Sequence, residues 1–168
     1  MIKLIFFKCI IGGALVLLCT YLGILKGNTY TNREYILRDI NNILKRIKNE
    51  VNYTQNTMPS SIKEAVIDMN EALKKIFNEI AESMLKDESK EDIVSKIEFI
   101  KPYDKQIISS CVNSLGKADI ETENLVIDSC INALEVQIED AKEEKIKNAK
   151  LFKSLGTLCG IAIFIILI

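Results

Sequence analysis

The sequence predicts an all-α protein, an antiparallel helical bundle flanked by an N-terminal and a C-terminal transmembrane helix. Three observations support this prediction. The 168-residue chain carries a long apolar segment at each end. Between these segments, apolar residues recur every three or four positions, as in helices that bury one face. No stretch alternates apolar and polar residues over the length of a strand.

The C-terminal segment, Leu151 to Ile168, has no charged side chain and no proline from Ser154 onward. A helix of this length spans about 27 Å, close to the ~30 Å thickness of the hydrocarbon core of a bilayer. Lys153 lies near one end, where its long aliphatic stem can carry the ammonium group to the lipid headgroups. These features predict a C-terminal transmembrane helix over residues 151–168.

A second apolar run, Cys9 to Leu25, lies near the N-terminus. Lys3 and Lys8 precede it, as positive charges precede the apolar region of a signal peptide. No A-x-A-like cleavage site follows Leu25, however. We therefore expect a retained N-terminal anchor over residues 1–26 rather than a cleaved signal peptide.

Positive charge is concentrated before the second apolar segment and is absent after it. Because loops rich in lysine and arginine tend to stay in the cytoplasm, we expect the middle region, residues 27–150, to be a cytoplasmic helical domain and both termini to face away from it. The lysines that support this orientation are Lys142, Lys145, Lys147, Lys150 and Lys153.

The first half of the middle region predicts two long helices. One runs from Arg33 to about Gln55, where Pro59 disfavours further helix. Ser61 to Glu64 has the form of a capping box, which satisfies free amides at a helix start. We expect the second helix to begin there, to end near Leu85, and to pack against the first as an antiparallel hairpin.

The second half predicts a short helix from Glu91 to Phe99, then a helix from Tyr103 to Leu115 with Pro102 in its first turn. Gly116 is a candidate C-cap, because glycine adopts a positive φ without strain. Asp119 is a candidate N-cap for one last helix that runs to the C-terminus.

Composition argues against several functional classes. The balance of 22 basic and 23 acidic residues gives no electrostatic case for binding nucleic acid. The absence of histidine rules out catalytic triads and zinc sites that need imidazole. Cys111 and Cys130 are expected to be buried thiols in a reducing compartment. We therefore predict no catalytic, metal-binding or cofactor-binding residues.

Glycines in the apolar ends suggest close helix packing. Gly156 and Gly160 form a G-x-x-x-G pattern, and Gly13 follows Gly12 in the N-terminal segment. Small residues four apart let two helix backbones approach closely within a membrane. Gly13, Gly156 and Gly160 are candidates for packing between the two spans or between subunits, and chance placement of glycine is the alternative.

Four segments in order resemble the stage III sporulation protein AB family of endospore-forming bacteria, and the resemblance covers essentially the whole chain. They are Arg33 to Leu44 followed by Glu50-Val51-Asn52-Tyr53, Met58-Pro59 leading into Ala65, Leu115-Gly116-Lys117-Ala118-Asp119, and Lys153 to Gly160 with the apolar end. Each segment alone is weak, and the ordered set between two apolar ends is fairly specific.

The resemblance implies a non-enzymatic subunit of the transmembrane channel complex that links mother cell and forespore. The family's helical region is similar to the cytoplasmic domains of the platform protein of type II secretion and type IV pilus systems. Its implied role is to couple a secretion-type ATPase, stage III sporulation protein AA, and other proteins of the same operon to the membrane complex. The implied location is the mother-cell membrane around the forespore, with the chain able to form a homo-oligomer.

Within the bundle, the candidates for partner contact are the helix end with Glu50 and Tyr53 and the turn with Leu115, Gly116 and Asp119. The alternative is an intramolecular role for each, with Tyr53 in the core. A competing function is a membrane-anchored helical regulator that sequesters a cytoplasmic partner. A membrane-bound enzyme would need a polar pocket with perturbed titratable groups, which the sequence gives no reason to expect.

Overall fold

A computed structural model describes residues 2–54, 56–86 and 90–167, and it describes their side chains except at 2–11, 149, 153, 164 and 167. These residues form helices and no strand, which confirms the all-α fold class. In chain order the helices are α1 (Ile2–Thr54), α2 (Met58–Ala65), α3 (Glu71–Lys86), α4 (Glu91–Ser95), α5 (Pro102–Ser114), α6 (Ile120–Glu144), η1 (Lys145–Ala149) and α7 (Lys150–Leu167).

The chain divides into two compact units. Unit 1 comprises Met1–Glu34 and Asp140–Ile168, and unit 2 comprises Tyr35–Glu139. Helices α1 and α6 therefore each contribute to both units. The domain bounds expected from the sequence, 1–26, 27–150 and 151–168, stay a prediction.

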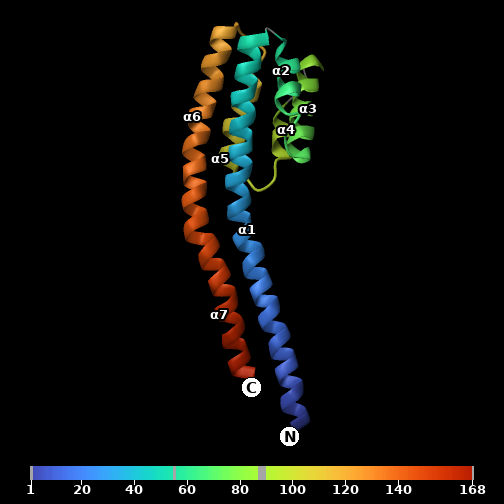
Figure 1. The fold of residues 1–168 in the computed structure, drawn as a ribbon, viewed down its shortest axis with the longest axis vertical. Helices are drawn as coiled ribbons and strands as arrows, with labels where there is room; N and C mark the ends of the chain where they lie inside the picture. The colour runs from blue at the N-terminus through green and yellow to red at the C-terminus, as the bar shows by residue number, and fades with distance from the viewer. Residues whose placement is uncertain (1, 55, 87–89, 168) are drawn as a thin grey trace. The chain divides into compact units, whose positions relative to one another are not determined.

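Unit 2 is organised around an antiparallel pair formed by the last part of α1 and most of α6 (Figure 1). Ion pairs along the pair show its direction: Lys45 contacts Glu135 at 2.8 Å, and further along α1 Lys48 contacts Asp128 at 2.7 Å. Beside these ion pairs, a buried apolar seam runs along the two helices. Its residues have the three- and four-residue spacing seen in the sequence. Its members are Leu37, Ile40, Ile43, Ile47 and Val51 of α1, and Ile127, Ile131, Leu134 and Ile138 of α6.

The predicted helix from Ser61 to Leu85 is wrong. The chain instead forms two helices, and Ser61 lies inside α2, fully buried, rather than at a helix start. The interruption is explained by Asn70, whose side-chain Oδ1 accepts a hydrogen bond from the Ala72 amide at 2.9 Å. An asparagine in that position satisfies a free amide and starts a new helix, which is α3. The second helix of the expected hairpin is therefore divided in two, and α2 packs on α3.

Helix α4 is also shorter than predicted, ending at Ser95 instead of Phe99. Phe99 has a φ of 62°, in the left-handed region, which a continuing helix cannot contain. Helix α5 matches its prediction closely and starts with Pro102 in the first turn. The Lys101 amide donates to the Asp104 carboxylate at 2.9 Å, which closes the start of α5.

Unit 1 pairs the N-terminal part of α1 with the C-terminal helices. Arg33 contacts Glu144 at 2.9 Å and Glu34 contacts Lys145 at 2.8 Å. Tyr30 stacks on Phe152 with ring centroids 5.8 Å apart. The single last helix expected from the sequence is interrupted by η1, one turn of π-helix between α6 and α7.

Among the described residues, no helix has both the length and the apolar character needed to cross a membrane. The two flanking transmembrane helices expected from the sequence are therefore not supported by the structure, although the segments concerned are helical in α1 and α7. Residues 1 and 168 and the side chains of 2–11, 149, 153, 164 and 167, which belong to or adjoin those predicted segments, lie outside the described part.

The Asn70 cap leads to a stability prediction. Replacing Asn70→Ala removes the acceptor for the Ala72 amide and should lower the free energy of unfolding by about 1 kcal/mol, the usual cost of losing such a cap. Denaturant unfolding of the full chain, followed by circular dichroism, measures this change. Asn70→Asp keeps the acceptor and should stay within a few tenths of a kcal/mol of the parent chain. Equal losses in both variants would contradict the cap assignment.

Candidate interaction surface

The turn between α5 and α6 is tightly fixed by its own contacts. Leu115 is buried in the core of unit 2. Gly116 has a φ of 79°, where a side chain would be strained, and its amide donates to Glu123 Oε1 at 2.7 Å. The positive φ and this hydrogen bond set the backbone path of the turn and the direction of the residues that follow it.

Asp119 stands directly before α6 and caps it. Its backbone carbonyl accepts the Glu123 amide at 2.9 Å. Its carboxylate accepts hydrogen bonds from the Thr122 hydroxyl and from nearby backbone amides, and these hold the pKa of Asp119 below its usual value. The side chain is exposed, so a partner could still reach it.

The last turns of α1 carry the other candidate residues. Tyr53 is 86% exposed, so the alternative that placed Tyr53 in the core is wrong. Glu50 is half-buried, and its backbone carbonyl accepts the Thr54 hydroxyl at 2.6 Å. An exposed tyrosine at a helix end has its ring available for contact with another molecule.

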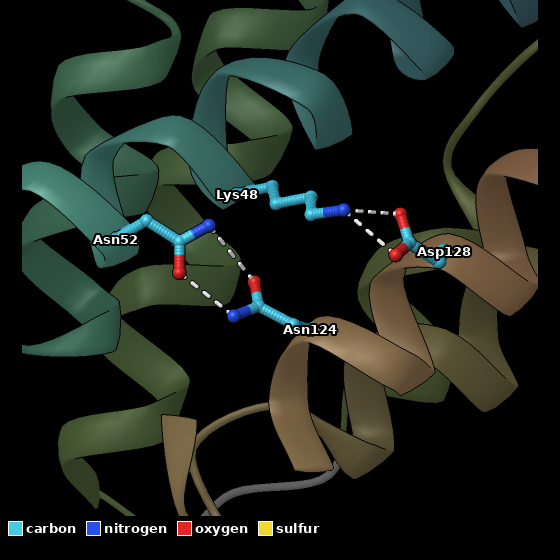
Figure 2. A network of polar contacts seen from close by, with 4 residues as sticks. All are labelled: Lys48, Asn52, Asn124 and Asp128. Atoms are coloured by element: carbon cyan, nitrogen blue, oxygen red, sulfur yellow. Dashed lines mark hydrogen bonds and ion pairs between the residues drawn. The ribbon is translucent and has the colours of Figure 1, made fainter. Parts of the chain in front are cut away.

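Polar pairs connect these two segments, as Figure 2 shows. The side-chain amides of Asn52 and Asn124 donate to each other at 3.2 and 2.7 Å. One turn away, the Lys48 ammonium donates to both carboxylate oxygens of Asp128 at 2.7 Å. The last turns of α1 and the first turns of α6 therefore lie side by side. A Cβ on Gly116 would lie 3.8 Å from Met58 Cβ, so the start of α2 lies at the same end.

The structure thus gathers both candidate segments at one end of unit 2. We call the exposed side chains there the end surface. It consists of Tyr53, Lys117, Asp119, Ile120 and Glu121. Tyr53 and the half-exposed Ile120 supply apolar area among charged groups, so an interface here would have a small apolar centre and a polar rim. The sequence singled out Tyr53 and Asp119 but missed the other three, whose only signal was their closeness to Asp119.

The glycine candidates fall into two groups in unit 1. A Cβ on Gly156 would lie 2.8 Å from the Cys19 carbonyl oxygen and 3.0 Å from Gly23 Cα. A Cβ on Gly160 would lie 2.9 Å from Val16 Cα, whereas Gly13 has nothing within 4 Å of that position. Backbones therefore meet at Gly156 and Gly160 within one chain, and Gly23 is a contact residue that the sequence analysis missed. Their role inside a membrane stays a prediction.

The two cysteines of unit 2, Cys111 and Cys130, are buried. The described residues contain no group of three or more cysteine, aspartate or glutamate side chains able to hold a metal ion. A hydrogen bond with Cys130, together with burial, raises the pKa of the Cys111 thiol, which keeps it protonated and unreactive. A groove of about 450 Å³ between α5 and α6 is lined by uncharged residues, these two cysteines among them.

A family model for stage III sporulation protein AB matches residues 8–168. The chain belongs to the stage III sporulation protein AB family. This confirms the family resemblance seen in the sequence and makes the chain a stage III sporulation protein. The stage III sporulation protein AB family is not a known enzyme family. No curated protein and no solved structure matches the chain.

The cap at Asp119 predicts a pH dependence. Its folded-state pKa lies below the ordinary value of 3.8, so the charged carboxylate adds stability that is present above that value and lost as the pH falls through the folded pKa. Asp119→Asn removes this contribution. Unfolding free energies measured from neutral pH down to about pH 3 should therefore fall less steeply for Asp119→Asn than for the parent chain. Identical slopes would show that Asp119 is not stabilised as a carboxylate.

Proposed function

We propose that this chain is a non-enzymatic platform subunit of the sporulation channel complex between mother cell and forespore. In this proposal the end surface binds a cytoplasmic secretion-type ATPase, stage III sporulation protein AA, and the apolar helices of unit 1 attach the subunit to the mother-cell membrane. Other proteins of the same operon, and further copies of the chain, complete the assembly.

The end surface is the single observation that carries the coupling role. A platform subunit must transmit a movement of its partner to the membrane complex without itself deforming. Here the contact residues stand on two helix ends that are joined by the Asn52 and Asn124 amides and by the Lys48–Asp128 ion pair. In the turn beside them, Gly116 and Asp119 are both held by hydrogen bonds. Preorganised surfaces of this kind lose little conformational entropy when a partner binds.

The exposed side chains of unit 1 support attachment to lipid. From residue 12 to residue 25 of α1 no described side chain is charged, and the same holds for residues 154–166 of α7. Large apolar side chains on these stretches are exposed, whereas soluble proteins rarely leave such continuous apolar area in water. They are Leu17, Leu18, Tyr21, Leu22, Ile24 and Leu25 of α1, and Leu155, Leu158, Ile161, Ile163, Ile165 and Ile166 of α7.

The positive charges that precede α7 give the proposed orientation. Lys142, Lys145, Lys147 and Lys150 lie before the apolar part of α7, and residues 154–168 contain no positive charge. By the positive-inside tendency, unit 2 then faces the cytoplasm, where the ATPase would reach the end surface.

Binding to the ATPase tests the coupling role. Full-length chain in detergent, titrated with purified ATPase, should bind saturably, and Tyr53→Ala should weaken the dissociation constant at least about tenfold, as for a central interface aromatic. Tyr103→Ala is the matched control. Tyr103 is 60% exposed but stands at the start of α5, the opposite end of that helix from Leu115, and its loss should leave binding unchanged.

Equal effects of the two tyrosine substitutions would remove the end surface from the proposal. No saturable binding by a folded parent chain would overturn ATPase coupling. Capture of a transcription factor or protease in place of the ATPase would favour the membrane-anchored regulator.

Flotation with lipid vesicles tests attachment. The full-length chain should float with vesicles of neutral and anionic phospholipid and should stay bound in high salt, because apolar burial is insensitive to ionic screening. Leu18→Glu combined with Leu158→Glu should greatly reduce the bound fraction. Leu125→Glu, which charges an equally exposed leucine of unit 2, is the control and should not. Release of the parent chain by salt would show electrostatic adsorption instead.

A further inference from the structure

The π-helical turn η1 is the least regular part of the C-terminal helices. A π-turn closes hydrogen bonds from residue i to residue i+5, so it accommodates one residue more than an α-turn does. Such turns are rare, and one persists only where surrounding contacts favour it. In unit 1, contacts with α1 lie on both sides of η1.

On the side toward α6, the contacts with α1 are ionic. Glu144 pairs with Arg33, and Lys145, the first residue of η1, pairs with Glu34. Only 5% of the Arg33 side chain and 9% of the Glu34 side chain are exposed. Each pair places opposite charges of α1 and of this part of the helix 2.8–2.9 Å apart, so the pairs favour the face that Glu144 and Lys145 turn to α1.

On the side toward the C-terminus, α7 contacts α1 first through the Phe152 ring, which stacks on Tyr30, and then through small residues. The backbone at Gly156 meets Cys19 and Gly23, and the backbone at Gly160 meets Val16. The flanking residues Leu155 and Cys159 are exposed. The glycine face of α7 therefore lies on α1, and the face with Leu155 and Cys159 does not.

The extra residue of η1 rotates the face of α7 by about 100° relative to the face of α6. Ala141, fully buried, marks the inward face before η1. In an uninterrupted α-helix, at about 100° per residue, Gly160 would lie about 100° away from that face. If the π-turn absorbs one residue, 18 residues instead of 19 contribute to the rotation between Ala141 and Gly160. They make about five whole turns, so Gly160 lies on the same face as Ala141. Without the π-turn, Leu155 and Cys159 would face α1 instead.

We propose that η1 is a one-residue phase adjuster that places the glycine face of α7 on α1. The ion pairs at Glu144 and Lys145 hold one side of the turn, and the glycine contacts hold the other. Leu155 cannot take the place of Gly156, because a Cβ at Gly156 already comes within 3.0 Å of backbone atoms. A change of η1 to regular α-helix would therefore both rotate α7 and push it away from α1.

Length changes within η1 test this inference because deletion and insertion have opposite expected results. Deleting Ile146 removes the extra residue, so the turn becomes regular α-helix and α7 keeps its glycine face on α1. Inserting one alanine between Ile146 and Lys147 adds a second extra residue, and Cys159 moves to the position of Gly160. An ordinary helix would respond to both changes with rotations of similar size.

Thiol alkylation of the full-length chain in detergent reads out the rotation. A small uncharged reagent and site-resolved mass spectrometry report the modification rate at each cysteine. In the insertion variant, alkylation of the native Cys159 should slow at least tenfold. In the deletion variant carrying Thr157→Cys and Cys159→Ala, alkylation at position 157 should stay within about twofold of the same substitutions at full length, because Thr157 is exposed and this position remains so.

Tenfold slower alkylation at position 157 in the deletion variant would overturn the proposal, since it would mean that this position had replaced Gly156 against α1 while the π-turn persisted. An unchanged rate at Cys159 in the insertion variant would overturn it as well. Deleting Lys147 instead of Ile146 must give the same result, because both side chains are exposed and only the residue count differs. Different results for these two deletions would show that a side chain, and not the phase, matters.

Discussion

The buried seam between α1 and α6 is the constraint on which unit 2 depends. Its leucine, isoleucine and valine side chains are almost completely removed from water, and each contributes on the order of 1.5–3 kcal/mol. The polar pairs at its edge add little energy, because they are exposed, but they oppose a shift along the seam. The short helices α2 to α5 pack around this pair and keep the α5–α6 turn beside the end of α1. The proposed contact surface is a consequence of that register.

The periodic apolar positions of the long helices could be predicted from the sequence, whereas features that depend on a single residue could not. The period of Ile40, Ile43 and Ile47 located the seam, because burial of one helix face imposes the same spacing at every turn. The helix break at Asn70 depends on one amide oxygen. In the sequence, the capping-box pattern at Ser61 is an equally good signal for a helix start. Tertiary burial of Ser61 decided between them, which no local pattern reveals. The exposure of Tyr53 likewise depends on the helix end that its neighbours form.

The glycines of unit 1 are another case in which the sequence shows a pattern but not the residues that the pattern contacts. Gly156 and Gly160 were visible as a pattern. Gly23, which meets Gly156, forms the same spacing with Gly27, but Lys26 interrupts the apolar run there, so the pair was not singled out. The π-turn could not be predicted, because an extra residue in a helix leaves no mark in hydrophobic periodicity over so short a length. It becomes evident only when the ion pairs of Glu144 and Lys145 and the contacts of Gly156 are placed on one helix. The proposed platform role combines these parts: a rigid end for a partner and an apolar helix pair for lipid.

The ion pairs of unit 1 also bear on the order in which the chain is assembled during synthesis. Arg33 and Glu34 each find their partners 111 residues later in the chain. Unit 2 lies wholly between them in the sequence, so its contacts can form while the ribosome is still making the last helices. Until then the backbone of α1 at Cys19 and Gly23 lacks the covering that Gly156 provides. The earliest part of the chain to be synthesised is thus the last to reach its final structure.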